Sequence, residues 1–212
     1  MRFALVENIR SEAISGQHGV CPFCRQPVIA KCGRKRISHW AHKANYVCDR
    51  WWESEEEWHR TWKSFFPADW QEKRCSNEDE WHVADICTDY GLVIEFQHSH
   101  LSETERETRE NFYGNMIWVV DGTRLKNDYK RFRKGIMDLD STGVSNPRRV
   151  FPDSWIASSK PVIFDFRKLR NDDLLVCLLP DVYYGIRCVR SFSSRDFIDG
   201  IKSGELFILH RS

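Results

Sequence analysis

Residues 82–97 have the sequence His82-Val-Ala-Asp85-Ile-Cys-Thr-Asp-Tyr-Gly91-Leu-Val-Ile-Glu95-Phe-Gln97. Apolar residues flank the turn Thr88–Gly91 on both sides, which predicts two antiparallel strands joined as a hairpin. The turn would bring Asp85 roughly opposite Glu95, with Gln97 two residues further on. Like charges opposite each other destabilise a sheet, but a divalent cation held by oxygen ligands removes this repulsion. The hairpin therefore predicts a divalent metal site at Asp85 and Glu95. The alternative is an exposed hairpin whose polar face meets water.

The composition indicates an ordinary globular chain. Its 212 residues are 41% apolar and 30% charged, which suits one domain with an appendage or two small domains. No apolar run approaches the roughly 20 residues of a membrane span, and the N-terminus is too polar for a signal peptide. We therefore expect a cytoplasmic protein with no membrane partner. In such a protein a Cys-x-x-Cys pair, among the eight cysteines, indicates metal binding rather than a disulfide. The net charge of +1 hides a basic N-terminal fifth and an acidic stretch after it, which suits nucleic-acid binding or ordinary solvated surfaces.

Hydrophobic periodicity predicts an α/β fold, a mixed sheet flanked by helices. Ser54 and Glu57 would cap a helix over residues 52–66, and a strand near 70–75 would precede the hairpin strands 81–87 and 92–97. A helix from Ser102 to about Tyr113 and a strand over 116–120 follow. Later strands are predicted over 161–166, 174–179 and 183–189, with a last helix from about residue 193 to 204. Three parts result: a small module over 1–50, a core over 51–145 and a C-terminal α+β extension over 146–212.

The N-terminal module carries a candidate zinc site. Cys21 and Cys24 are separated by two residues, so both thiolates can reach one ion from a tight turn. His39 and His42 are three residues apart and would share a face if they lay on one helical turn. Two cysteines and two histidines complete a tetrahedral Zn²⁺ site, with a free cysteine pair and surface histidines as the alternative.

Several of these motifs occur together in one family. Asp85 with Glu95-Phe-Gln97 resembles the core of the PD-(D/E)XK nuclease superfamily, in the variant with Gln for Lys. Over residues 21–120 the chain resembles the competence protein CoiA-like family, on motifs that follow in order: Cys21-Pro-Phe-Cys24, His39-Trp-Ala-His42, Glu55, His59, Lys63, Val83-Ala-Asp85, Ile94–Ser99, Arg109, Tyr113 and Ile117-Trp118. The resemblance implies a nuclease-like fold and an enzyme that cuts or processes DNA with Mg²⁺ or Mn²⁺. Transformation and phage defence, with protein partners in recombination or defence, are both compatible with it.

The helix over 52–66 would add side chains to such a site. Glu55, His59 and Lys63 lie at positions i, i+4 and i+8 and so share one face. Glu55 could be a third carboxylate or could orient a water molecule. His59 could be a general acid, a general base or a phosphate contact, or simply a helix-surface histidine. Gln97 can orient water but brings no charge, so Lys63 could supply the missing positive charge.

Nucleic-acid contacts are expected at two places. Arg34, Lys35 and Arg36 at the tip of the zinc module could hold a phosphate backbone. Arg109 could grip a phosphate, or could pair with Glu105 four residues earlier. We thus expect a metal-dependent deoxyribonuclease. One alternative is a DNA-binding accessory protein whose nuclease-like fold is inactive, and another is a zinc-stabilised protein-interaction domain.

Overall fold

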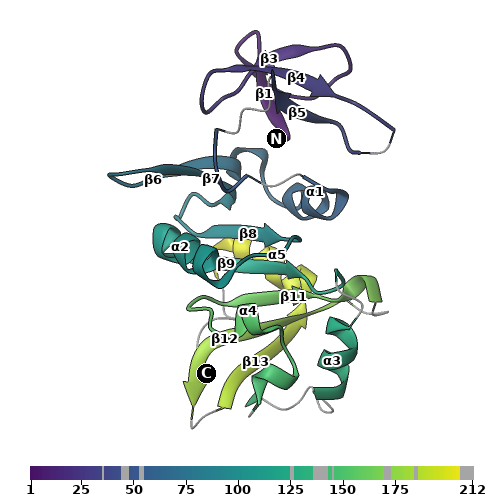
Figure 1. Ribbon diagram of the computed structural model, residues 1–212, viewed down its shortest axis with the longest axis vertical. Coiled ribbons are helices and arrows are strands. Elements are labelled where there is room, and N and C mark those ends of the chain that lie inside the picture. The colour runs from purple at the N-terminus through teal and green to yellow at the C-terminus, as the bar shows by residue number, and fades with distance from the viewer. Residues whose placement is uncertain are drawn as a thin grey trace. The chain divides into compact units, whose positions relative to one another are not determined.

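The computed structural model describes residues 1–34, 36–43, 48–52, 55–124, 127–135, 143–144, 146–169, 173–183 and 186–205. Two compact units result, residues 1–87 and residues 88–212 (Figure 1). Each unit is an assembly of strands and helices, so the predicted mixed α/β class is confirmed. Lys35 and the predicted helix cap Ser54 lie outside the described residues.

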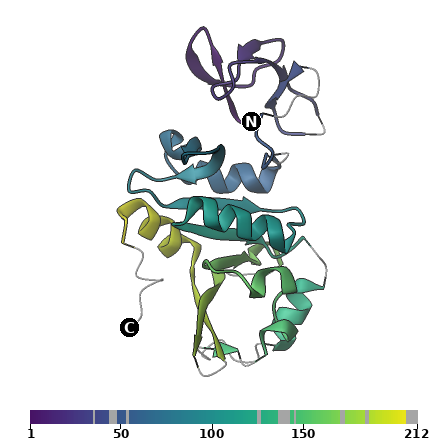
Figure 2. The same cartoon turned by 60° about the vertical axis from the view of Figure 1, so that its left-hand side comes forward.

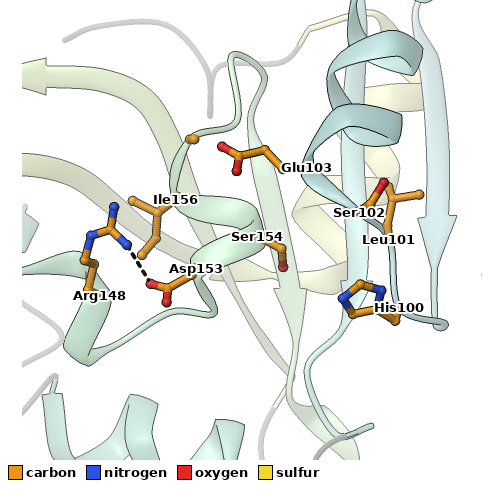
Figure 3. Close-up of a pocket in the computed structure, with 9 residues that line it drawn as sticks. His100, Leu101, Ser102, Glu103, Arg148, Asp153, Ser154 and Ile156 are labelled. Atoms are coloured by element: carbon orange, nitrogen blue, oxygen red, sulfur yellow. Dashed lines mark hydrogen bonds and ion pairs between the residues drawn. The ribbon is translucent and has the colours of Figure 1, made fainter.

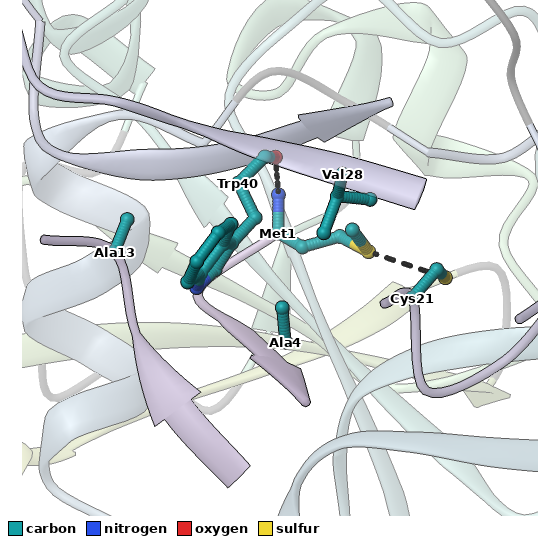
Figure 4. Packing of buried hydrophobic residues seen from close by; sticks show 6 residues of the cluster. All are labelled: Met1, Ala4, Ala13, Cys21, Val28 and Trp40. Atoms are coloured by element: carbon teal, nitrogen blue, oxygen red, sulfur yellow. Dashed lines mark hydrogen bonds between the residues drawn. The ribbon is translucent and has the colours of Figure 1, made fainter. Parts of the chain in front are cut away.

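The first unit begins with a small antiparallel sheet of order β2-β1-β3-β4-β5. Its core is a cluster of buried apolar side chains, with Trp40 fully buried at the centre (Figure 4). The Trp40 indole Nε1 donates to the Ser11 carbonyl at 2.9 Å, so this ring is hydrogen-bonded as well as packed. The strands are β1 (Phe3–Val6), β2 (Ile9–Glu12), β3 (His18–Val20), β4 (Pro27–Lys31) and β5 (His39–His42).

A helix and a hairpin complete the first unit. Helix α1 (Glu57–Ser64) begins later than the predicted helix over 52–66, because Glu56 stands at its N-cap in an extended conformation. After the short 3-10 helix η2 (Ala68–Trp70) come strands β6 (Gln71–Ser76) and β7 (Trp81–Cys87), which pair antiparallel. The Gln71 amide donates to the Phe66 carbonyl at 2.8 Å and so ties the hairpin to the end of α1.

The second unit has a mixed sheet in which β10-β13-β12-β11-β9-β8 is the strand order. Strands β8, β9 and β11 run parallel, whereas β10, β12 and β13 pair antiparallel with their neighbours. All five residues of β8 and all six of β9 are buried, as expected for strands covered on both faces. The bounds are β8 (Val93–Gln97), β9 (Met116–Asp121), β10 (Gly143–Val144), β11 (Val162–Asp165), β12 (Leu174–Tyr183) and β13 (Ile186–Ser193).

Helix ends in the second unit follow the capping residues. The Ser102 hydroxyl accepts from the Glu105 amide at 3.2 Å, and Gly114 ends α2 (Glu103–Tyr113) with a positive φ of 66°. Ser193 caps the last helix in the same way. Figure 2 shows α2 lying across one face of the sheet. The remaining elements are α3 (Asp128–Gly135), η3 (Pro147–Arg149), α4 (Asp153–Ile156), η4 (Arg167–Leu169) and α5 (Ser194–Ser203).

The units do not coincide with the three parts predicted over 1–50, 51–145 and 146–212. Hydrogen bonds join the small sheet to strand β6. The Arg2 amide donates to Glu72 at 2.7 Å, and the Arg10 guanidinium donates to the Gln71 carbonyl at 2.7 Å. These contacts unite residues 1–50 with the helix and hairpin that follow. No helix among the described residues is long and apolar enough to cross a membrane.

Candidate functional site

Four metal-ligating side chains converge in the small sheet. The donor atoms of Cys21, Cys24, His42 and Cys48 all lie within 4.8 Å of one another. The Cys21 and Cys48 sulfurs are 4.0 Å apart, and the Cys24 sulfur is 3.2 Å from His42 Nε2. Tetrahedral Zn²⁺ with Zn–S bonds of about 2.3 Å places its sulfur ligands about 3.8 Å apart. Three thiolates and one imidazole therefore fit a structural Zn²⁺, and this cluster can hold such an ion.

A tight turn between β3 and β4 brings the first two thiols together. The Cys21 amide donates to the Gln26 carbonyl at 2.9 Å, and the Arg25 amide donates back to the Cys21 carbonyl at 3.0 Å. Arg25 has a positive φ of 62°, a conformation that a residue with a side chain adopts rarely. The turn is thus closed by hydrogen bonds between Cys21 and both Arg25 and Gln26, with Cys24 inside it, so the Cys-x-x-Cys spacing alone predicted that the two thiols meet.

The prediction that His39 is a ligand of the zinc site is wrong. His39 and His42 lie on strand β5 rather than on a helical turn, and side chains three residues apart on a strand point to opposite faces. The His39 ring contacts the Ile37 carbonyl at 2.9 Å, whereas His42 faces Cys24. Cys48, which was not among the four predicted ligands, takes the fourth position of the cluster.

The cluster thiols differ in their acidity. A hydrogen bond with Cys48 lowers the pKa of the Cys21 thiol to about 5, and the same hydrogen bond raises the pKa of Cys48. Burial raises the pKa of Cys24. The Cys21 thiolate is thus stabilised by a neighbouring thiol. The thiolate is the form of cysteine that binds a metal ion.

A second cluster in the first unit gathers three carboxylates around one buried lysine. The Lys63 ammonium lies 3.2 Å from Glu55, 3.4 Å from Glu72 and 3.2 Å from Asp85. The side chains of Lys63, Glu55 and Glu72 are all at least nine-tenths buried, while that of Asp85 is 21% exposed. The predicted residues Glu55, Lys63 and Asp85 therefore do come together. We call these four residues the Lys63 cluster.

Burial and charge oppose each other in the Lys63 cluster, and charge prevails. Burial by itself lowers the pKa of Lys63, but Asp85, Glu72 and Glu55 outweigh it and raise the pKa above the usual value. Burial by itself raises the pKa of Glu55, but Lys63 and Arg60 bring it down to about 2. Lys63, Glu55 and Glu72 are therefore charged near neutral pH. Placing them away from water costs several kcal/mol per ion unless the charges are well paired, so the cluster demands a functional or structural reason.

Glu72 is the member that sequence reasoning missed. It lies between the register pairs Gln71–Ile86 and Lys73–Ala84, so it faces Asp85 across the β6–β7 pair. Its φ of 44° is in the left-handed region, which costs roughly 1–3 kcal/mol for a residue other than glycine. Besides Lys63, its carboxylate accepts from the amides of Arg2 and Phe3 at 2.7 and 3.2 Å. Nothing in the sequence signalled this role, because a single acidic residue on a short strand is ordinary.

Arg60 on α1 borders the Lys63 cluster. Arg60 donates to Glu55 at 2.5 Å and to the Ser38 carbonyl at 2.9 Å. His59 is only 4% exposed, so it is not the helix-surface histidine that was one of its predicted alternatives. Its ring meets the Trp58 ring edge-on, with centroids 5.3 Å apart.

Strand β8 places two predicted site residues in the second unit. Glu95 is 7% exposed and lies 3.8 Å from the Arg109 guanidinium on α2. Arg109 also pairs with Glu105 at 2.5 Å, which is the alternative partner that its spacing predicted. The Gln97 amide donates to the Ser99 hydroxyl at 3.1 Å. In this arrangement Arg109 neutralises carboxylates rather than facing solvent as a phosphate grip.

Three basic residues were predicted to contact nucleic acid at the tip of the zinc module. Arg34 and Arg36 are exposed, as such contacts would have to be, and Lys35 is not described.

The second unit has a pocket of about 400 Å³ between the start of α2 and α4 (Figure 3). His100, Glu103 and the ion pair of Arg148 with Asp153 line it. Its mixed charge and exposed pairs indicate no particular ligand.

The small sheet with its Cys₃His cluster is a module that can hold a metal ion. Residues 7–50 match the family described as competence protein CoiA, N-terminal domain. The predicted similarity to CoiA-like proteins is thereby confirmed for this module. It includes Cys21, Cys24, His42 and Cys48, which we call the Cys21 cluster. No curated protein and no solved structure matches the chain.

Proposed function

We propose that this protein is a divalent-metal-dependent nuclease that hydrolyses phosphodiester bonds in DNA. The observation that carries the proposal is the Lys63 cluster, in which buried charges are held at fixed positions beside the partly exposed Asp85. Buried, strongly shifted ionisable groups with specific charged partners are typical of functional sites. The match to the CoiA N-terminal domain agrees with a role in DNA processing.

In this proposal Asp85 and Glu95, which the sequence places on consecutive strands of a hairpin, supply carboxylate oxygens to Mg²⁺ or Mn²⁺. Hard oxygen ligands suit these ions. The bound ion would lower the pKa of a water molecule and polarise the scissile phosphate. Lys63 would stabilise developing negative charge, Glu55 would hold Lys63 in place, and Gln97 would orient water through its amide. A PD-(D/E)XK nuclease-like fold and a cytoplasmic location are part of the same proposal.

A second candidate is a DNA-binding accessory protein that does not cut. One observation favours it: each proposed metal ligand already has a cationic neighbour. Asp85 lies 3.2 Å from Lys63, and Glu95 lies 3.8 Å from Arg109. A cation beside each carboxylate lowers its need for a metal ion. Partners in recombination or phage defence fit either candidate.

The test is cleavage of labelled single-stranded, double-stranded and branched DNA with and without added Mg²⁺ or Mn²⁺. We expect cleavage that requires the added ion and falls by about 10² or more in Asp85→Ala, because misplaced catalytic geometry has effects of this size. Asp79→Ala is the matched control, since Asp79 is an exposed carboxylate in the loop between β6 and β7. DNA binding without cleavage under every condition would replace the nuclease with the accessory protein.

A further inference from the structure

Helix α3 carries a cationic face that the proposed active site does not use. Lys130, Arg133 and Lys134 are all exposed. Their positions i, i+3 and i+4 put them on one side of the helix, with neighbouring side chains about 5–6 Å apart. In the part of the chain that the structure describes, none of the three makes an ion pair with a carboxylate.

The opposite side of α3 is anchored in an aromatic cluster. Phe132 is 2% exposed, and its ring centroid lies 4.7 Å from that of Phe166 and 6.1 Å from that of Phe151. Tyr129 lies 5.5 Å from Phe166 by the same measure. These contacts prevent the helix from rolling about its axis, so the cationic side chains stay directed outward. In Figures 1 and 2, α3 lies at the outside of the second unit.

Neighbouring segments extend the positive charge. The short helix η3 packs against α3, and its Arg148 and Arg149 are exposed, as is Arg124 before α3. The ion pair of Arg148 with Asp153 does little to neutralise this charge, because both side chains are more than 70% exposed and such pairs are weak. Residues 121–150 contain eight lysines and arginines and four aspartates, in a chain whose net charge is only +1.

We propose that the exposed face of α3, with Arg124 and Arg149 beside it, binds the phosphate backbone of DNA. The inference rests on the proposed function only in taking DNA as the polyanion. Flexible lysine and arginine side chains on a fixed helix suit phosphates, which neutralise them without demanding a base sequence. The exposed side of the helix offers no asparagine or glutamine that would read base edges. Binding here is therefore independent of sequence and positions the strand rather than selecting it.

The experiment measures the affinity of the full chain for a labelled DNA by fluorescence anisotropy at several KCl concentrations. Mg²⁺ and Mn²⁺ are omitted, and no chelator is added because it would also strip Zn²⁺. The triple variant Lys130→Ala, Arg133→Ala, Lys134→Ala is compared with Lys168→Ala, Arg195→Ala, Lys202→Ala. The control removes the same charge from exposed positions elsewhere in the second unit. Thermal unfolding confirms that both variants are folded.

Each phosphate contact contributes about 0.9 to the slope of log K against log salt. We expect the α3 variant to lower that slope by about 2–3 and to weaken binding at least roughly tenfold at 0.1 M KCl, with the control close to wild type. An α3 variant with the wild-type slope, or a control with an equal loss, would overturn the inference. Wild-type DNA binding without cleavage, together with the slope change, would remove the nuclease proposal and leave this surface in place.

Discussion

The Cys21 cluster and the Lys63 cluster lie in the same unit but differ in how their negative charge is neutralised. The Cys21 cluster brings together donors that bind soft cations, and no cationic side chain stands among its four ligands. The Lys63 cluster has a cation of its own in the Lys63 ammonium. We infer that the Cys21 cluster depends on a bound ion for its stability. The Lys63 cluster is stable without a bound ion, so its partly exposed Asp85 is available as a ligand or catalytic group.

The largest expected effect comes from removing the ion of the Cys21 cluster. Structural Zn²⁺ contributes about 10–16 kcal/mol of apparent binding free energy in small zinc domains, so its loss should unfold the small sheet. We expect one Zn²⁺ per chain by elemental analysis, and a loss of both the metal and the sheet in Cys48→Ser. His39→Ala is the control and should keep the ion. A chain purified without chelator that is folded and free of metal would contradict this prediction.

The second largest effect, on stability and on cleavage, is expected from Lys63→Met. This change leaves Glu55, Glu72 and Asp85 close together without their shared cation. Removing one partner of a buried ion pair costs about 3–5 kcal/mol, which urea unfolding of a Zn²⁺-loaded chain can measure. Cleavage should fall further than in Gln97→Ala, because a charged donor stabilises developing charge more than an amide does. If Lys63→Met keeps wild-type stability and cleavage, Lys63 is not a member of a working site.

The smallest effect concerns the pH dependence of Glu55. Its pKa is about 2 in the folded chain, below the value of about 4.3 of an unperturbed glutamate. A depressed carboxylate pKa stabilises the fold above about pH 4.3, and this contribution is lost as the pH falls towards 2. Glu55→Gln should therefore flatten the acid side of the stability curve by a few kcal/mol.

The measurement for Glu55 is chemical denaturation between pH 3 and pH 7. The exposed Glu57, one turn of helix away from Arg60, provides the control, because Glu57→Gln should leave the curve unchanged. Equal curves for wild type and Glu55→Gln would show that Lys63 and Arg60 do not hold this carboxylate ionised.

Elements that depend on local patterns were predicted well. The helix with Ser102 and Gly114 at its ends agrees with α2, and the buried run from Met116 agrees with β9. Capping residues, glycine with positive φ and apolar runs act within a few residues, so they can be read without knowledge of the fold. The helix over 52–66 was predicted too long because an extended Glu56 precedes α1.

Side chains that meet across the chain were predicted less well. The residue types pointed to a thiolate and imidazole site and to a charged site that includes Glu55, Lys63 and Asp85, because such groups are poor packing unless they are paired or bind an ion. The order of residues did not reveal that Cys48 replaces His39, or that Glu72 joins Lys63. Those contacts depend on which face of β5 each histidine occupies and on the register of β6 with β7, and a shift of one residue in a strand moves every side chain to the other face.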